Sequence, residues 1–267
     1  MTITIATFNV NSVRSRMHIL LPWLEAVSPD IVCLQETKVQ DFEFPQDALR
    51  AAGYYVTFKG QKSYNGVAIL SKSEPSSVVN GFHDDGPADE SRLLIAQIAG
   101  ITVVNTYVPQ GRDVEHEMYA YKLSWFDRLR AMFETRFSPD QPIVWVGDIN
   151  VAPTDIDIHD PKRLLGHVCF NPRVTEAFHK VTDWGFVDVF RKHVSGGGQY
   201  TYFDYRAKDG VADGKGWRID HIQATRPLAD RSTRSWIDLA PRLADKPSDH
   251  TPLLAEFTDE AGIQTPA

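Results

Sequence analysis

The sequence predicts a single α/β domain in which β-sheets pack together and are flanked by helices. Short apolar segments rich in Val and Ile recur along the 267 residues, and longer segments of helical periodicity lie between them. Hydrophobic residues make up 42% of the chain and charged residues 24%, which are ordinary values for a globular protein with a sizeable core. We assign residues 1–258 to this domain and expect the polar residues 259–267 to form a disordered tail.

Charge and cysteine content argue against several classes of protein. The 28 basic and 35 acidic residues give a net charge of −7, which argues mildly against nucleic-acid binding. Cys33 and Cys169 lie far apart, so neither a disulfide framework nor a zinc knuckle is indicated. The N-terminus has no basic segment followed by an apolar stretch, and no apolar run reaches membrane-spanning length. A cytoplasmic protein without membrane contact is the expectation.

The N-terminal half begins with a strand and a helix. Ile3 and Ile5 alternate with threonines, which predicts a strand over residues 2–10. An amphipathic helix is expected over residues 15–27, broken or restarted at Pro22. The following segments predict strands at residues 30–34, 54–58, 66–71, 92–98 and 101–108, a helix at 46–52 and a loop at 73–86.

The remaining elements are predicted by the same patterns. Ala99-Gly100 is a two-residue hairpin signal between two of the strands. The aromatic and basic cluster at residues 200–206 is interpreted either as a strand or as a binding surface. Helices are expected at residues 115–137 and 173–184, and strands at 217–222 and 253–257.

Residues 143–150, with the sequence IVWVGDIN, read as a buried strand that ends in polar side chains. Side chains alternate between the two faces of a strand, so Asp148 and Asn150 are expected to point the same way at its end. Gly147 leaves room for another group to approach the backbone. Taken alone, the pattern also fits an ordinary strand followed by a polar turn.

Several other predicted strands end in polar residues in the same manner. Glu36 is unusual because an isolated charge at the tip of a buried strand is costly unless it is paired or metal-bound. If the sheets bring these ends to one rim, they form a cluster of oxygen donors with one imidazole. Such a cluster favours Mg²⁺ or Mn²⁺ and suits acid–base or phosphate chemistry. The residues concerned are Asn9, Glu36, Tyr107, Asp148, Asn150, Asp220, Asp249 and His250.

Two other motifs do not indicate a site. The acidic segment beginning at Asp155 lacks the Gly and Glu that a calcium loop requires at its sixth and twelfth positions. The glycines at residues 196–198 are not followed by the Lys and Ser or Thr of a phosphate loop. His159 and His167 are expected to be loop residues without a metal role.

Six motifs, taken together, resemble those of the exonuclease III family of abasic-site endonucleases. They are FNVN at residues 8–11, LQETK at 34–38, YVPQG at 107–111, GDINVAPTD at 147–155, WRID at 217–220 and PSDH at 247–250. Their order and spacing match across essentially the whole chain. The resemblance implies the fold of that family, a deoxyribonuclease I-like four-layer α/β sandwich with two mixed β-sheets flanked by helices.

The resemblance also implies a function. It indicates a Mg²⁺-dependent DNA-repair nuclease that hydrolyses the phosphodiester 5′ to abasic sites, with 3′–5′ exonuclease or 3′-end trimming as a further activity. Mn²⁺ is the expected substitute for Mg²⁺. The expected partner is double-stranded DNA containing abasic sites or blocked 3′ ends, bound by a monomer. Two alternatives stay open: a phosphoesterase acting on a small or lipid phosphate, and a non-catalytic DNA-binding module on the same fold.

The resemblance implies catalytic roles for the residues of this chain that match the family's motifs. Asp148 would orient or deprotonate the attacking water, and Asn150 would hold that water or a phosphate oxygen. His250 would contact the phosphate, with Asp220 fixing its ring. Tyr107 would donate to the phosphate or support the leaving oxygen. The implied metal site consists of Glu36 with Asn9, Asp249, Asp148 and Asn150 close by.

Other positions match the family's DNA-binding surface. Tyr202, Trp217 and Ile219 would line a pocket for a flipped-out, base-free sugar. Tyr202 stands where bacterial exonuclease III has Trp and animal relatives have Phe, and His221 stands where an apolar or aromatic residue is common. These departures leave the balance between abasic-site cutting and 3′-end degradation open. The expected DNA contacts, each of which also fits a solvated surface group, are Arg92, Gln110, Arg112, Lys122 and Arg206.

Overall fold

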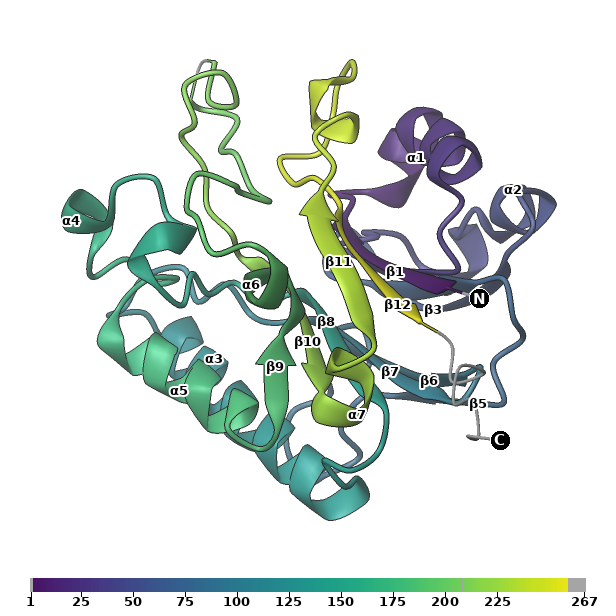
Figure 1. The fold of residues 1–267 in the computed structure, drawn as a ribbon, viewed down its shortest axis with the longest axis horizontal. Coiled ribbons are helices and arrows are strands. Elements are labelled where there is room, and N and C mark those ends of the chain that lie inside the picture. Colours follow the sequence, from purple (N-terminus) through teal and green to yellow (C-terminus); the bar gives the residue numbers. More distant parts are fainter. Residues whose placement is uncertain (1, 208, 259–267) are drawn as a thin grey trace, which may run out of the picture.

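Two six-stranded sheets stack face to face in the computed structural model, which describes residues 2–207 and 209–258 (Figure 1). The first sheet has the strand order β11-β12-β1-β2-β4-β3 and the second has the order β5-β6-β7-β8-β10-β9. The strands are β1 (Thr2–Asn9), β2 (Ile31–Gln35), β3 (Tyr55–Lys59), β4 (Val67–Ser71), β5 (Ser77–Asn80), β6 (Leu93–Ile98), β7 (Ile101–Tyr107), β8 (Ile143–Asp148), β9 (Phe186–Asp188), β10 (Asp220–Thr225), β11 (Ser232–Ile237) and β12 (Leu253–Thr258). The predicted tail lies outside the described residues.

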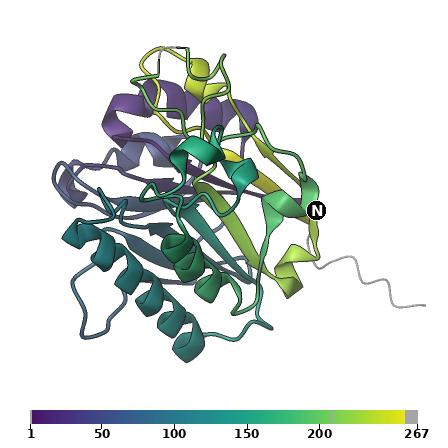
Figure 2. The same cartoon turned by 90° about the vertical axis from the view of Figure 1, so that its left-hand side faces the viewer.

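Helices cover the outer faces of both sheets, so the molecule has four layers (Figure 2). Helices α1 and α2 pack on the first sheet, and helices α3 and α5 pack on the second. No helix of the described chain is both long and apolar enough to cross a bilayer. The helices are α1 (Val13–Val27), α2 (Gln46–Ala51), α3 (Glu117–Arg136), α4 (Pro161–Leu164), α5 (Pro172–Thr182), α6 (Val189–His193) and α7 (Arg226–Ala229), with 3₁₀ turns η1 (Asp41–Glu43), η2 (Asp155–Asp157) and η3 (Pro241–Leu243).

The alternation of side chains on each strand builds three separate cores. On β2, Ile31 and Cys33 face the second sheet, whereas Val32 and Leu34 face helices α1 and α2. On β8, Trp145 packs against helices α3 and α5. Strands buried on both faces explain why the sequence shows continuous apolar runs rather than alternation with polar residues. The predicted four-layer sandwich of two mixed sheets is confirmed.

Some sequence predictions at the level of single elements were wrong. Helix α1 runs through Pro22 without a break, because Pro22 is exposed and the carbonyl it leaves unbonded can be solvated. The predicted loop at 73–86 contains the edge strand β5. Residues 200–206 form no strand, and Tyr202 makes only isolated bridges to Trp217 and His250.

The ends of the central strands meet at one rim of the sandwich. β1 and β2 pair in parallel in the first sheet, and β7 and β8 do so in the second. Parallel strands end at the same edge, so Asn9 and Gln35 are neighbours on one side, and Tyr107 and Asp148 on the other. The antiparallel strand β10 places Asp220 directly opposite Asp148. The fold therefore gathers polar groups that are far apart in the sequence.

Gly147 is required where β8 approaches β7. Its φ is +141°, and a Cβ atom built on it would lie 1.9 Å from the carbonyl oxygen of Thr106. The room predicted at this glycine is thus filled by the neighbouring strand. Any side chain there would push apart the two strands that carry Tyr107 and Asp148.

We expect Gly147→Ala to lower the free energy of unfolding by at least about 2 kcal/mol, because it adds a backbone clash to a strained φ. Gly100→Ala is the control. Its φ is +80°, but a Cβ atom there meets nothing within 4 Å, so only strain of about 1 kcal/mol remains. Urea denaturation of both variants compares the two losses. Equal losses would contradict the steric explanation.

Candidate active site

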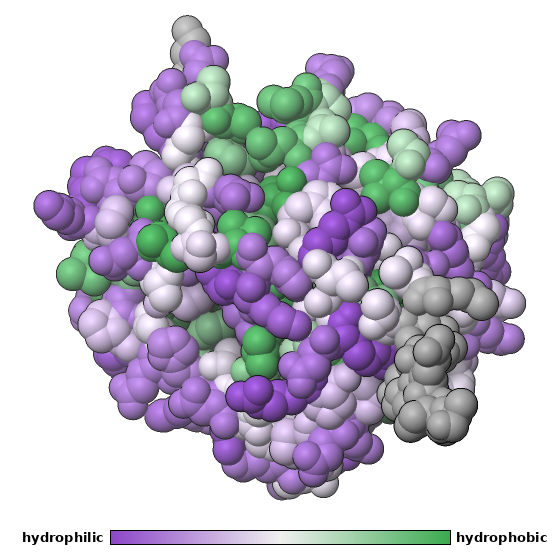
Figure 3. All heavy atoms as spheres, in the orientation of Figure 1, coloured by the Kyte–Doolittle hydropathy of each residue, from purple (hydrophilic) through white to green (hydrophobic). Residues whose placement is uncertain are grey.

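The rim holds a pocket of about 310 Å³ with one polar and one largely apolar wall. The polar wall contains the acidic groups and His250, and the other wall contains aromatic and aliphatic side chains. Figure 3 shows one face of the molecule in the orientation of Figure 1, with apolar side chains lying among polar ones toward the top. The lining residues are Glu36, Tyr107, Gln110, Asp148, Asn150, His167, Cys169, Tyr202, Asp204, Arg206, Trp217, Ile219, Asp249 and His250.

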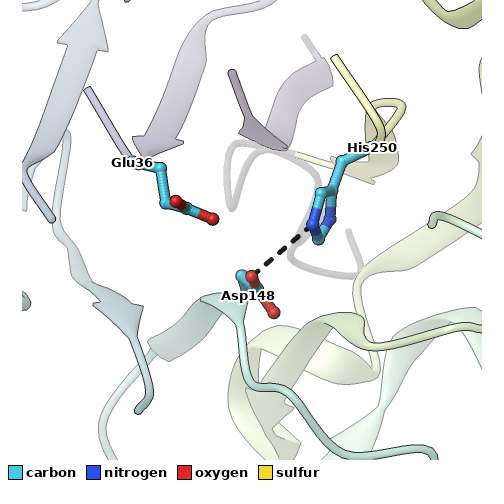
Figure 4. Close-up of side chains that lie close together, drawn as sticks. All are labelled: Glu36, Asp148 and His250. Carbon is cyan, nitrogen blue, oxygen red and sulfur yellow. Dashed lines mark ion pairs between the residues drawn. The ribbon is translucent and has the colours of Figure 1, made fainter. Parts of the chain in front are cut away.

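Glu36, Asp148 and His250 point toward one another at the centre of the polar wall (Figure 4). Each offers one ligand atom, and these atoms lie within 4.8 Å of one another. Asn9 joins the two carboxylates, since its Nδ2 donates to Oε1 of Glu36 at 2.8 Å and to Oδ2 of Asp148 at 2.9 Å. The amide oxygen of Asn9 accepts from the backbone of Asn11. Asn9 therefore faces the cluster as a hydrogen-bond donor in this structure, and its place in the metal site stays a prediction.

The environment of Asp148 opposes its charge. Burial raises the pKa of Asp148 to about 8; the charges of Asp220 and Glu36 add to this effect, whereas His250 and Asn9 oppose it. Its Oδ1 accepts from the backbone N–H of Asn150 at 3.0 Å. Asp148 is thus held in one orientation and is a stronger base than an ordinary aspartate.

His250 is held by two carboxylates. Its Nδ1 donates to Oδ2 of Asp220 at 2.8 Å, and its Nε2 lies 3.7 Å from Oδ2 of Asp148. Burial on its own disfavours the charged ring, but Asp220 and Asp148 raise the pKa of His250 to about 10. His250 is therefore a cation at neutral pH, with Nε2 directed toward Asp148.

Glu36 is paired with a residue that the sequence analysis did not assign. Burial would raise its pKa, but Lys38 and Asn9 hold the pKa of Glu36 below its ordinary value. Nζ of Lys38 lies 2.8 Å from Oε2 of Glu36 and donates to Oδ1 of Asn11 at 2.6 Å. Nδ2 of Asn11 in turn donates to Asp249 at 2.9 Å. Asn11 lies in the FNVN motif and Lys38 in the LQETK motif, so their place in these motifs could have identified them from the sequence.

The donor set fits a divalent cation. With all four ionised, the carboxylates carry two more charges than the two cationic side chains that they face, and one divalent cation would balance this excess. Oxygen donors without thiolates suit a hard cation. Oδ1 of Asp220 is buried and has no hydrogen-bond partner among the described residues. The groups counted are Glu36, Asp148, Asp220 and Asp249 against Lys38 and His250.

Tyr107 and Asn150 stand beside this cluster. Burial and the charges of Glu36 and Asp148 raise the pKa of Tyr107 well above its ordinary value, so the phenol stays a donor. The guanidinium of Arg92 lies 4.8 Å from the centre of the Tyr107 ring and donates to the backbone carbonyl of Tyr107 at 3.1 Å. Nδ2 of Asn150 donates to the carbonyl of Val108, so this amide is already partly engaged.

The apolar wall is formed by Tyr202, Trp217 and Ile219. Tyr202 and Trp217 exchange backbone hydrogen bonds of 2.9 Å, and the Tyr202 ring lies 5.0 Å from the ring of His250. His167 also reaches this wall, with its ring 4.7 Å from that of Trp217. Sequence reasoning treated His167 as an ordinary loop residue, because its loop carries no periodic or spacing signal.

A buried ion network lies behind the apolar wall. Arg218 alternates with Trp217 and Ile219 and points away from the pocket, where it pairs with Asp157 at 2.6 Å and Asp188 at 2.8 Å. His221 belongs to this network. Its Nδ1 accepts from Arg218 at 3.0 Å and its Nε2 donates to the carbonyl of Val151 at 2.8 Å. The unusual residue at position 221 therefore does not enter the pocket.

The predicted DNA contacts differ in their surroundings. Gln110 and Arg206 line the pocket, and Arg112, close to Gln110 in the sequence, is exposed. Arg92 is instead engaged with Tyr107. Lys122 was wrongly predicted, since its side chain is fully buried and donates to the carbonyls of three loop residues, Gln110, Asn150 and Val168, at 3.2, 2.7 and 3.0 Å.

Comparisons with known proteins agree with this architecture. The family model described as endonuclease/exonuclease/phosphatase matches residues 6–250. Exodeoxyribonuclease III of Haemophilus influenzae is 37% identical over 263 residues, covering 94% of this chain and 98% of that protein. The structure of an AP endonuclease from Archaeoglobus fulgidus superposes with a TM-score of 0.94 and 49% identity, covering 96% of this chain and all of that chain.

A third relative was solved with a nucleic acid. The 3′ phosphatase NExo from Neisseria, bound to product DNA hairpin, superposes with a TM-score of 0.91 and 34% identity, and covers 96% of this chain and all of that chain. The family model spans most of the sequence, and the relatives match over nearly their whole lengths. This chain therefore belongs to the exonuclease III and AP endonuclease family, within the endonuclease/exonuclease/phosphatase superfamily.

Proposed function

We propose that this protein is a divalent-metal-dependent DNA-repair nuclease that hydrolyses the phosphodiester 5′ to abasic sites and also acts at 3′ ends. The observation that carries the proposal is a single pocket with a charged wall and an apolar wall. The charged wall suits a phosphate and the apolar wall suits a sugar without its base. The relatives support both activities, since they include an AP endonuclease, an exodeoxyribonuclease and a 3′ phosphatase.

Glu36 and Asp148 would hold the cation, with Asp249 on the adjoining wall. We infer Mg²⁺, with Mn²⁺ as a substitute, from the oxygen donors. When bound, the ion supplies charge neutralisation at the phosphate and lowers the pKa of coordinated water. Lys38 and Asn9 keep Glu36 ionised and oriented before the ion arrives.

Asp148 acts on the proton of the attacking water, and His250 acts on the negative charge of the phosphate. Asp148 orients the attacking water and accepts its proton, with its carboxylate fixed by hydrogen bonds from Asn9 and the backbone of Asn150. His250, as a cation, donates from Nε2 to a phosphate oxygen. Asp220 holds the opposite side of the ring through Nδ1, so it keeps the imidazolium both charged and aimed.

Tyr107 and Asn150 complete the phosphate site. Tyr107 remains protonated and can donate to the phosphate or to the leaving oxygen, while Arg92 fixes its position. Asn150 supports the water or a phosphate oxygen from the other side. Such groups act by positioning and by charge stabilisation, which are the main requirements of phosphoryl transfer.

The apolar wall supplies lesion recognition. Tyr202, Trp217 and Ile219 would contact a sugar that has swung out of the duplex, and His167 narrows the same space. A nucleotide that lacks its base costs less to flip out than an intact one. Arg206 and Arg112, exposed near the pocket, would contact backbone phosphates.

Two labelled duplexes test this function. One carries a single abasic-site analogue, and the other is undamaged with a recessed 3′ end. We expect Mg²⁺-dependent nicking 5′ to the analogue, a ladder of shortened products from the second duplex, and neither product with chelator. If neither duplex is cut with any divalent metal, the nuclease proposal fails, and lipid or small-molecule phosphates become the next substrates to assay.

Asp148→Asn should lower kcat by about 10²- to 10⁴-fold, because the amide cannot accept a proton from water. Affinity for the abasic duplex, measured by fluorescence anisotropy, should stay near that of the unaltered protein. Asp140→Asn, at an exposed position away from the pocket, is the control and should retain full activity. Unchanged cleavage by Asp148→Asn would overturn the assigned role.

The salt dependence of DNA affinity tests whether the exposed Arg206, and not the buried Lys122, contacts a DNA phosphate. Arg206, whose side chain is 90% exposed, should contribute about 0.9 to the slope of log affinity against log salt concentration if it contacts one phosphate. Arg206→Met is therefore expected to reduce the slope by that amount. Lys122→Met should leave the slope unchanged because Lys122 is buried. The reverse result would restore Lys122 as a DNA contact.

A further inference from the structure

Gln35 and Asn105 join the two sheets at the edge that carries the active site. Gln35 is the last residue of β2 and directly precedes Glu36, and Asn105 lies on β7 two residues before Tyr107. Both side chains are fully buried, and neither lines the pocket. They therefore adjoin site residues without being able to touch a substrate.

Their hydrogen bonds cross from one sheet to the other. Nε2 of Gln35 donates to Oδ1 of Asn105 at 2.7 Å. Nδ2 of Asn105 donates to the carbonyl oxygens of Leu34 at 3.0 Å and Ala68 at 2.9 Å, which belong to β2 and β4. One carboxamide from the second sheet thus makes three hydrogen bonds to the first. Thr7 supports Gln35 from within the first sheet, at 3.0 Å.

Most of the layer between the sheets is apolar, apart from the rim, where Asn9 of β1 donates to Asp148 of β8. Apolar packing has no directional preference, so it resists separation of the sheets better than a small sideways displacement. Hydrogen bonds require particular distances and angles. Burying two amides is costly unless they are bonded, and here both are. This pair therefore supplies directional contacts behind the rim, inside a layer that is otherwise mostly apolar.

The active site depends on that sideways position. Glu36 and Asn9 come from the first sheet, and Asp148 and Tyr107 come from the second. We propose that Gln35 and Asn105 are positioning residues that set the offset between the sheets and thereby the separation of Glu36 from Asp148. The proposal rests on the proposed nuclease function and identifies how the fold holds that site in its active geometry.

Two variants separate positioning from stability. Asn105→Leu leaves the Gln35 amide without its cross-sheet acceptor, so its melting temperature should fall. Adding Gln35→Met makes both partners apolar, which should recover part of that loss. Catalysis should not recover. In both variants we expect kcat on the abasic duplex to fall roughly 10- to 100-fold, with a smaller change in KM.

Metal affinity gives a measurement that does not need substrate. Mn²⁺ titrated into the protein and followed by electron paramagnetic resonance should bind about tenfold more weakly in the double variant. Thr102→Val with Gln97→Met is the matched control. It removes a 2.7 Å side-chain hydrogen bond from the far end of the same β6–β7 hairpin. This control should keep the kcat and Mn²⁺ affinity of the unaltered protein.

The proposal is overturned if the double variant retains full kcat and Mn²⁺ affinity, or if the control loses as much of both. If the double variant does not fold, Gln35→Met alone is measured per folded molecule and judged by the same criteria. If the unaltered protein cuts no DNA, the nuclease proposal fails separately. Mn²⁺ affinity and the melting temperatures then still decide whether the amide pair positions the site.

Discussion

The structure depends on how it balances negative charge around Asp148. Glu36 and Asp220 are near neighbours of this buried carboxylate, and burial would make such a group unfavourable if nothing compensated it. His250 and Lys38 supply two positive charges, and Asn9 supplies two hydrogen bonds. These contacts stabilise the cluster but leave it with an excess of negative charge. The charges of Asp220 and Glu36, which add to burial in raising the pKa of Asp148, would also favour a bound cation.

Backbone conformation aims these side chains as much as the strands do. Glu36, directly after β2, and Asn150, two residues after the end of β8, both have positive φ, at 49° and 55°. A left-handed residue turns the chain sharply, so its side chain can point back across the rim instead of continuing along the strand. Such conformations are costly for residues other than glycine. They are kept here because hydrogen bonds, including those of Asn150 to Asp148 and Val108, hold the turns in place.

The pocket wall is supported by buried cations that do not touch it. Lys122 gathers three loops through their carbonyl groups, and burial lowers its pKa. Through two carboxylates, Arg218 anchors the segment before β10 that presents Trp217 and Ile219. A charge buried in this manner specifies one arrangement of its partners, since any other leaves it unsatisfied. Loops are usually the mobile parts of a fold, but these contacts hold the apolar wall of the pocket in one position.

The sequence by itself determined the layers and the composition of the site. Apolar runs of strand length and the amphipathic helices predict packed sheets flanked by helices because burial on both faces leaves a readable pattern. The four-layer sandwich was implied by the resemblance of the six motifs to the exonuclease III family. The sequence motifs predicted Glu36, Asp148 and His250 as site residues, and the structure brings these three side chains together. Tertiary structure alone decided the role of Lys122, whose position on a helix looked like any exposed lysine. It also decided the pairing of Gln35 with Asn105 and the entry of His167 into the pocket. Contacts between residues distant in sequence leave no periodic signal, since they arise only when the sheets and loops pack together.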